Sequence, residues 1–302
     1  MGVAVPCSRS YRYILSFNPS LYIMRTPAKE ALYPALTRAT FQAMQQAVIY
    51  LPPDVKRAID HAVSQESDPV ALGELANILK NITEAERLGI PLCQDTGVPV
   101  VYLTIPPHIP FSAQLYDAVA EGIRQATKAV PLRPNVVDPL TRKNSGDNTG
   151  AGMPAIHVKP GSRFTVTVLP KGAGAENVSR IAMLLPSEVD EIEKFVVETM
   201  LIAEGKPCPP VVLGIGIGST FDGVAALAKE ALLLPIDQMD PFEQHLCDAV
   251  NRLRTGPMGL GGDTTALAVK VKTGACHTAS LPVAVNVQCW ACRRATVEVT
   301  WE

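Results

Sequence analysis

The stretch Pro210-Val-Val-Leu-Gly-Ile-Gly-Ile-Gly218 contains no charged residue and gives the clearest fold signal in the chain. Its apolar run predicts a buried strand that ends near Gly216, and the apolar spacing that follows predicts a helix from about Asp222 to Leu234. The glycines between them predict a tight turn where the backbone closely approaches another backbone or a ligand. Their spacing does not match a dinucleotide-binding site, because the third glycine comes one residue too early and no acid follows about 20 residues later.

The segments on both sides of this stretch show helical and strand-like patterns. Residues 27–89 have helical apolar spacing with breaks at 52–53 and 67–69, which predicts three helices. Further helices are predicted over 112–128, 189–204 and 242–253, the second with a capping box of Ser187 and Asp190, and strands over 98–105, 154–158, 163–168, 264–272, 281–287 and 296–301. We therefore predict a mixed α/β (α+β) fold, with helices that flank the sheet and a helical N-terminal part.

The composition argues against several classes of protein. The 302 residues carry 27 Lys and Arg against 29 Asp and Glu, a net charge of −2, so the basic excess that binding a nucleic-acid backbone requires is missing. Charged residues make up 19% and apolar residues 47%, which predicts a globular chain with a large core or a large interface. Apolar runs stay well short of the roughly 18 residues that a membrane-spanning helix needs. We expect neither a nucleic acid nor a membrane as a partner.

The first 25 residues differ from the rest of the chain in charge. They contain Arg9, Arg12 and Arg25, and the first acidic residue of the chain is Glu30. This bias fits an organelle-targeting segment, and it fits at least as well a leader or mis-started extension before a start at Met24. We expect residues 1–25 to be disordered and treat residues 26–302 as one domain.

Polar and glycine-rich loops separate the predicted elements, and loops of this kind often carry chemistry. The loop at 133–152 is uncommonly long for a compact domain, which indicates a function. The segment Gly256-Pro-Met-Gly-Leu-Gly-Gly-Asp-Thr-Thr265 is similar to a phosphate-binding loop, but Asp263 stands where such a loop needs lysine. We therefore reject an ATP site.

Seven cysteines, an odd number, are spread through the chain, which indicates reduced thiols in a cytosol-like, cytoplasmic compartment. Cys289-Trp-Ala-Cys292 matches a redox or zinc motif in spacing only, although Cys276 and His277 could complete a zinc site. By contrast, Cys93, Cys208 and Cys289 each lie in a loop beside polar or glycine-rich residues. Three thiolates would leave one iron of a [4Fe–4S] cluster open, and an open metal position suits a Lewis-acid catalyst.

Several motifs in a fixed order make the sequence recognisable. It resembles the iron–sulfur hydro-lyases, specifically the α subunit of the two-subunit class I fumarate hydratases and the related L-tartrate dehydratase α subunit. The resemblance covers about residues 27–302. It rests on Cys93-Gln-Asp-Thr-Gly97, Pro131-Leu-Arg-Pro-Asn135, Asn144-Ser-Gly-Asp-Asn-Thr-Gly150, Pro170-Lys-Gly-Ala-Gly-Ala-Glu-Asn177, Cys208-Pro-Pro210, Gly256-Pro-Met-Gly-Leu-Gly-Gly262, His277-Thr-Ala-Ser-Leu-Pro282 and Gln288-Cys289.

The resemblance implies roles for individual residues. Cys93, Cys208 and Cys289 match the ligands of a [4Fe–4S] cluster, whereas Cys276 and Cys292 do not match ligand positions. The residues implied to contact substrate are Gln94, Asp95, Arg133, Lys171, Gly172 and His277, of which Gln94, Asp95 and His277 are also implied to be catalytic. Asp95 would handle a proton or orient the hydroxyl or water, the Arg133 fork would bind a carboxylate, and Lys171-Gly172 would approach the ligand with its backbone.

The resemblance further implies the reversible hydration of fumarate to S-malate, a step of the tricarboxylic acid cycle. It also implies a β subunit that supplies the base, in a hetero-oligomer such as α2β2. Gly146-Asp-Asn-Thr-Gly150 favours fumarate, whereas Cys289-Trp-Ala followed by Arg293-Arg294 is more similar to the L-tartrate enzymes, and Ala173 and Ala175 depart from the family pattern. A rival hypothesis from another class is a non-catalytic binding or assembly subunit that Cys276, His277, Cys289 and Cys292 stabilise with zinc.

Overall fold

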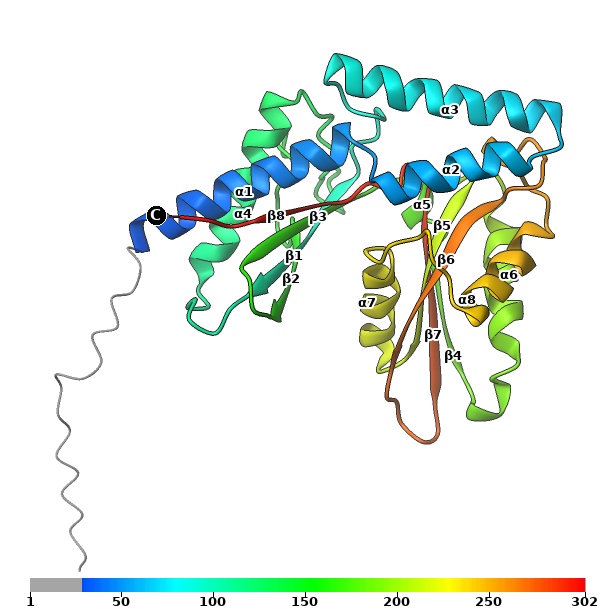
Figure 1. Cartoon of the computed structure of the whole chain (residues 1–302). Coiled ribbons are helices and arrows are strands. Elements are labelled where there is room, and N and C mark those ends of the chain that lie inside the picture. Colours follow the sequence, from blue (N-terminus) through cyan, green and yellow to red (C-terminus); the bar gives the residue numbers. More distant parts are fainter. Residues whose placement is uncertain (1–28, 302) are drawn as a thin grey trace, which may run out of the picture.

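Two four-stranded mixed sheets, each covered by helices, organise the chain (Figure 1). The computed structural model describes residues 29–301, so the predicted leader at 1–25 lies outside the described residues. The mixed α/β class, the flanking helices and the helical N-terminal part are confirmed. Within the described residues, none of the helices combines the length and the apolar character that crossing a membrane requires.

The N-terminal part consists of three helices, α1 (Lys29–Ile49), α2 (Pro53–Gln65) and α3 (Pro69–Leu88). Proline at the first position starts α2 and α3, where its missing N–H is not needed. The Asp68 side chain caps α3 by accepting hydrogen bonds from the N–H groups of Val70 and Ala71. Gly89, at a φ of 65°, ends α3 in the left-handed conformation, and the chain then turns toward the next sheet.

The first sheet has the strand order β2-β1-β3-β8. Its strands are β1 (Val98–Ile105), β2 (Ala155–Pro160), β3 (Thr165–Lys171) and β8 (Ala295–Glu298). β2 runs parallel to β1, whereas β3 is antiparallel to both β1 and β8. α1 and α4 (Ala113–Ala129) pack against this sheet, and the core between them is apolar and closed to solvent.

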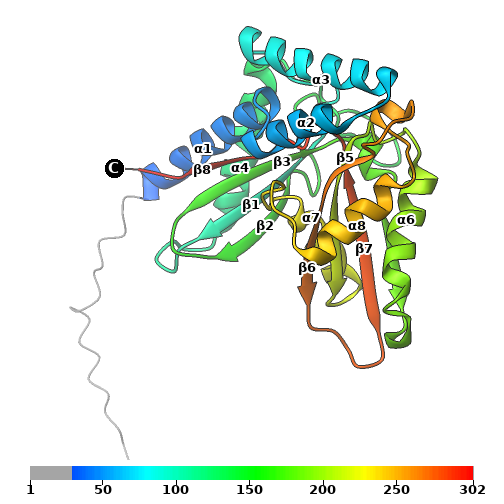
Figure 2. The ribbon, with the colours of Figure 1, turned by 45° about the vertical axis from the view of Figure 1, so that its right-hand side comes forward.

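The second sheet has the order β4-β7-β5-β6. Its strands are β4 (Arg180–Leu184), β5 (Val211–Gly218), β6 (Ala266–Gly274) and β7 (Leu281–Gln288). β5 pairs parallel with β6 and antiparallel with β7. α7 (Phe221–Ala231) covers one face, and α6 (Glu191–Ala203) with α8 (Pro241–Asn251) covers the other (Figure 2). The remaining helical pieces are short: α5 (Ala173–Glu176), η1 (Pro186–Glu188) and η2 (Pro257–Gly259).

One apolar cluster connects the two sheets beneath α2 and α3. It combines Val100 and Leu169 of the first sheet with Val212 and Ala268 of the second, and Ile59 of α2 packs into it. All five side chains are almost completely buried. This shared core fixes the ends of the two sheets relative to each other, and these ends carry the loops discussed below.

One sequence prediction about local structure is wrong, and two short elements are missing from the prediction. The capping box expected from Ser187 and Asp190 does not form, because Asp190 makes no side-chain cap to α6 and Glu188 accepts from the N–H of Leu185 instead. A capping box is found at α8, where Asp240 and Glu243 bond each other's backbone N–H groups. The strand β4 and the short helix α5 were not predicted.

Two glycines of β5 serve the packing of α7, whereas the predicted turn lies at Gly218 and Ser219, which have φ values of 86° and 68°. Gly214 and Gly216 lie within the strand, and the predicted close approach of backbone to backbone is present. A Cβ atom on Gly214 would lie 2.1 Å from the carbonyl oxygen of Ala228, and one on Gly216 would lie 2.2 Å from that of Val224. The missing side chains therefore let α7 lie directly on the strand.

We predict that Gly216→Ala destabilises the protein by about 1–3 kcal/mol, because the added methyl group pushes α7 away from β5. Gly73→Ala is the matched control, since Gly73 lies in α3 and a Cβ atom added to it would meet no neighbouring atom within 4 Å. The control should stabilise the protein by about 0.5–1 kcal/mol through the better helix propensity of alanine. Urea unfolding followed by circular dichroism measures both, and equal effects of the two substitutions would contradict this account of β5.

Candidate functional site

Strand register brings four of the predicted loops to one end of the two sheets. In the first sheet Val98 pairs with Lys171, so the segment 93–97 that enters β1 lies beside the residues that leave β3. In the second sheet Val212 pairs with Gln288, so Cys208 before β5 lies beside Cys289 after β7. Antiparallel pairing thus places segments far apart in the sequence side by side.

Direct contacts join the four loops. The N–H of Trp290 donates to the carbonyl oxygen of Cys208 at 3.3 Å, which ties the second cysteine segment to the third. The Arg293 guanidinium donates through Nη2 to the carbonyl oxygen of Asp95 at 3.0 Å, which ties the third segment to the first. Lys171 Nζ donates to the carbonyl oxygen of Val287 at 2.5 Å, which ties β3 to β7. The three predicted cysteine segments therefore share one region.

The thiols of this region lie within electrostatic range of one another. Partial burial of the thiol raises the pKa of Cys208, and the negative charges of Cys93 and Asp95 raise it further. Burial also raises the pKa of Cys289, where the positive charge of Arg293 opposes the rise and Cys93 adds to it. Cys208 is exposed to solvent and has a φ of 55°, which is unusual for cysteine and often marks a functional residue.

The carboxylate of Asp95 is held in one orientation. Its Oδ1 accepts from the N–H of Gly97 and from Asn135 Nδ2, both at 2.9 Å, and its Oδ2 accepts from the N–H of Ala173 at 3.0 Å. A Cβ on Gly172 would lie 3.1 Å from Oδ2, so the backbone of this glycine borders the carboxylate closely. Gly97 itself has a φ of 77° and no room for a side chain against the Lys171 backbone. Asp95 and Gly172, both predicted site residues, are therefore neighbours.

Asn148 holds the segment that carries Arg133, a role that was not evident from the sequence. Its Oδ1 accepts from the N–H of Asn135 at 2.6 Å, and its Nδ2 donates to the carbonyl oxygen of Arg133 and to Thr127 Oγ1, both at 3.2 Å. Asn148 is fully buried and has a φ of 60°, a conformation that asparagine tolerates better than most residues. The long loop at 133–152 thus folds back to support Arg133 and, through Asn135, Asp95.

Three of the predicted residues line a common hollow of about 370 Å³. Cys93, Gln94 and Arg133 border it, and the side chains of Gln94 and Arg133 are exposed. The remaining lining residues are Ile90, Pro91, Thr96, Pro131 and Leu132. The hollow therefore offers a thiol, an amide and a guanidinium to a small polar molecule.

Lys171 takes part in the structure through a buried ion pair. Its side chain has no exposed surface, and Nζ lies 3.0 Å from Glu176 Oε2. Burial lowers the pKa of Lys171, against the opposing effect of Glu176. The side chain points into the protein, so only the backbone of Lys171 can face a ligand, in the way that the resemblance implies.

His277 lies far from the other predicted residues within one chain. It belongs to the turn between β6 and β7, and Cys289 follows the opposite end of β7. The seven residue steps from Leu281 to Gln288 correspond to about 23 Å in a strand. A single chain therefore does not bring His277 to Cys93, Cys208 or Cys289.

The same strand separates the four residues of the predicted zinc site. Cys276 and His277 are exposed at one end of β7, and Cys292 is buried at the other with a pKa that burial raises to about 11. Among residues 29–301, no group of three or more His, Cys, Asp or Glu side chains is close enough to hold a single metal ion. The zinc hypothesis is therefore not supported.

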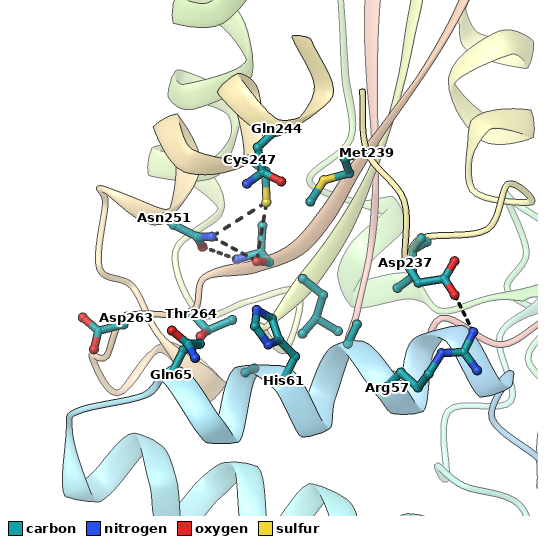
Figure 3. A pocket seen from close by; sticks show the side chains of 15 residues that line it. Arg57, His61, Gln65, Asp237, Met239, Gln244, Cys247, Asn251, Asp263 and Thr264 are labelled. Carbon is teal, nitrogen blue, oxygen red and sulfur yellow. Dashed lines mark hydrogen bonds and ion pairs between the residues drawn. The ribbon is translucent and has the colours of Figure 1, made fainter. Parts of the chain in front are cut away.

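A second hollow, of about 680 Å³, lies between α2, α8 and β6 (Figure 3). Its charged groups are already paired, because Arg57 contacts Asp237 and Asp263 contacts Arg254. The Cys247 thiol in its wall is buried, and burial raises its pKa to about 12, so it is unreactive. None of the predicted site residues lines this hollow, and we do not assign it a function.

The rejection of an ATP site agrees with the structure of the glycine-rich loop. The carboxylate of Glu66 accepts hydrogen bonds from the N–H groups of Asp263 and Thr264 at 2.8–3.2 Å, as well as from Ser67 and Asp68. Glu66 is buried beneath the loop. A carboxylate of the protein thus occupies the backbone donors that a phosphate would need.

Comparison with known proteins supports the resemblance. The model of the family described as "Fumarate hydratase (Fumerase)" matches residues 37–298. The chain is 45% identical over 267 residues to "Putative L(+)-tartrate dehydratase subunit alpha" of Methanocaldococcus jannaschii, covering 84% of this chain and 94% of that protein. It is 31% identical over 259 residues to "L(+)-tartrate dehydratase subunit alpha" of Escherichia coli, covering 82% and 86%.

A third relative is longer than this chain. The chain is 36% identical over 285 residues to "Putative fumarate hydratase class I" of Geobacillus stearothermophilus. The match covers 87% of this chain but only 55% of that protein. The chain therefore spans about half the length of this relative and nearly the full length of the two α subunits.

We predict that Asn148→Gly destabilises the protein by about 2–4 kcal/mol, because the three hydrogen bonds of a buried side chain are lost while glycine keeps the left-handed backbone. Amide hydrogen exchange at 133–135 should accelerate at the same time, since Asn135 loses its acceptor. Arg142→Gly is the matched control, because Arg142 has the same φ of 60° in the same loop and an exposed side chain. Its effect should stay within about 0.5 kcal/mol. Unchanged exchange at 133–135 in the Asn148 variant would show that this side chain does not hold the Arg133 segment.

Proposed function

The chain belongs to the fumarate hydratase family, and from this premise we propose that it is the α subunit of an iron–sulfur hydro-lyase that reversibly hydrates fumarate to S-malate. The observation that carries the proposal is the convergence of the three segments of Cys93, Cys208 and Cys289 beside a hollow that Gln94 and Arg133 line. Homologues with hydro-lyase names support the class of reaction.

The donor set fits a [4Fe–4S] cluster held by Cys93, Cys208 and Cys289. All three are free thiols, and they come from separate segments, so each could bind a different iron of the cube. Thiols that bind different irons of one cluster need not meet at a single ion. Beside Cys289, the buried guanidinium of Arg293 has two nitrogen atoms without a hydrogen-bond partner among the described residues, as expected next to an anionic group. When bound, such a cluster would supply an open iron as a Lewis acid.

The residues around the hollow have complementary tasks in this proposal. Arg133 binds one carboxylate of the substrate through its planar fork and fixes the molecule in place. The Gln94 amide donates to the other end of the substrate. Asp95, whose orientation is set by three N–H donors, accepts a hydrogen bond from the water or hydroxyl that is added or removed. The backbone at Gly172 narrows the site on the side of Asp95.

We further propose that a β subunit completes the active site. The hollow is open to solvent in this chain, and the base that takes the carbon-bound proton is not evident among the residues that line it. Two relatives are named as α subunits, and the Geobacillus relative has nearly half its length beyond the match.

The six described cysteines are all free thiols, which suits a reducing, cytoplasmic compartment.

L-tartrate dehydration is the second candidate function. It is supported by the relative at 45% identity, whose name assigns it to L(+)-tartrate. Fumarate and L-tartrate share two carboxylates at the ends of a four-carbon chain, so the tasks of Arg133 and Gln94 are the same for both. The two reactions differ in the hydroxyl groups on the central carbons, which a residue near Asp95 must accommodate.

We predict that Cys93→Ser abolishes the cluster. The wild-type chain, purified without oxygen, should be brown and contain iron and acid-labile sulfide, whereas the variant should lose most of both because one of three ligands is missing. Cys276→Ser is the control and should keep the wild-type iron content, since Cys276 is exposed at the far end of β7. Equal iron in both variants, or zinc in place of iron, would refute the assignment of the ligands.

We predict that the chain, co-expressed with its β subunit without oxygen, hydrates fumarate and that Arg133→Met lowers kcat/KM by about 10²-fold or more. Loss of a hydrogen-bonded ion pair with a carboxylate removes both positioning and charge stabilisation. The assay follows fumarate absorbance and, in parallel, oxaloacetate formed from L-tartrate. Turnover of L-tartrate without turnover of fumarate would show that L-tartrate dehydration is the reaction. If neither compound is turned over, the substrate assignment is overturned even if iron is present.

A further inference from the structure

The side chain of Arg293 is charged, almost completely buried and only partly bonded. Its exposed fraction is 1%. Nη2 donates to the carbonyl oxygen of Asp95, but Nε and Nη1 have no hydrogen-bond partner among the described residues. No carboxylate within these residues forms an ion pair with it, unlike the neighbouring Arg294, which pairs with Asp54. A buried cation without a counter-charge is strongly destabilising, so a compensating group is expected.

The position of Arg293 indicates which group compensates its charge. It follows Cys289 by four residues and reaches the backbone of Asp95, two residues after Cys93, so its guanidinium lies between the first and third cysteine segments. An anion from the solvent cannot reach a side chain that is 1% exposed. A group that is bound between the cysteine thiols can contact this side chain.

We propose that Arg293 is a positioning residue for the iron–sulfur cluster, with Nε and Nη1 donating hydrogen bonds to its sulfur atoms and the guanidinium balancing its negative charge. This inference rests on the proposed function. Three thiolates make the ligated cluster anionic, and sulfur atoms of such clusters accept N–H donors. Arg293 then has two states: an uncompensated cation in the chain without the cluster, and a paired cation in the chain with it.

Because of this difference, the effect of Arg293 on stability should depend on whether the cluster is present, which is not expected of a purely structural residue. A residue that only ties Cys289 to Asp95 stabilises the chain with and without the cluster to the same extent. An uncompensated cation destabilises the chain without the cluster and stabilises the chain that holds it. Replacement of Arg293 should therefore have opposite effects on the two forms.

The test compares the full chain with Arg293→Met and Arg293→Lys, all handled without oxygen. Urea unfolding of the cluster-free forms should give a midpoint for Arg293→Met equal to or above that of the wild type. Iron release from the loaded forms to a chelator should be about tenfold or more faster in Arg293→Met, because hydrogen bonds to a charged acceptor are lost. Arg293→Lys, which keeps the charge but loses the fork, should release iron at an intermediate rate.

The outcomes distinguish the inference from the proposed function. If the wild-type chain holds no iron after reconstitution, the proposed function fails and the inference fails with it. If the wild type holds iron and Arg293→Met releases it at the wild-type rate, only the inference is overturned. A cluster-free Arg293→Met form with a lower urea midpoint also overturns it, because the contacts of Arg293 within the protein would then explain its presence.

Discussion

The antiparallel pairing of β1 with β3 and of β5 with β7 is the constraint on which the rest of the structure depends. Register places Val98 beside Lys171 and Val212 beside Gln288, so four loops emerge at one end of the two sheets. The apolar cluster between the sheets fixes these ends relative to each other. The loops themselves need little regular structure, because the strands behind them set their positions.

The strands set the approximate positions of the loops, and polar contacts then fix the individual side chains. Asp95 accepts three N–H donors, Asn148 holds the Arg133 segment, and Lys171 connects β3 with β7 through a carbonyl oxygen. These contacts bond the side chains of Asp95, Asn148 and Lys171 within the protein. The exception is Arg293, which is buried while two of its nitrogen atoms have no hydrogen-bond partner among the described residues. These unpaired donors are the strongest structural argument for a bound anionic group.

Sequence patterns predicted the long, periodic elements and the residue types of the site, but not the contacts between distant segments. β4 was missed because it is a five-residue edge strand with two exposed residues and no fully buried one, which leaves a weak pattern. The glycines of β5 indicated a close approach but could not identify α7 as the neighbour. The role of Asn148 depends on partners 13 and 15 residues away, and His277 stands near Cys289 in sequence although a whole strand separates them.

The central claim is that Cys93, Cys208 and Cys289 hold one iron–sulfur cluster beside Arg133. Anomalous scattering at the iron edge, from crystals of the full complex grown without oxygen, measures this directly. The account predicts a single compact iron peak in contact with these three sulfur atoms, with one iron that no cysteine binds. A peak at Cys276 and Cys292, or separate peaks at individual thiols of the three, would contradict it.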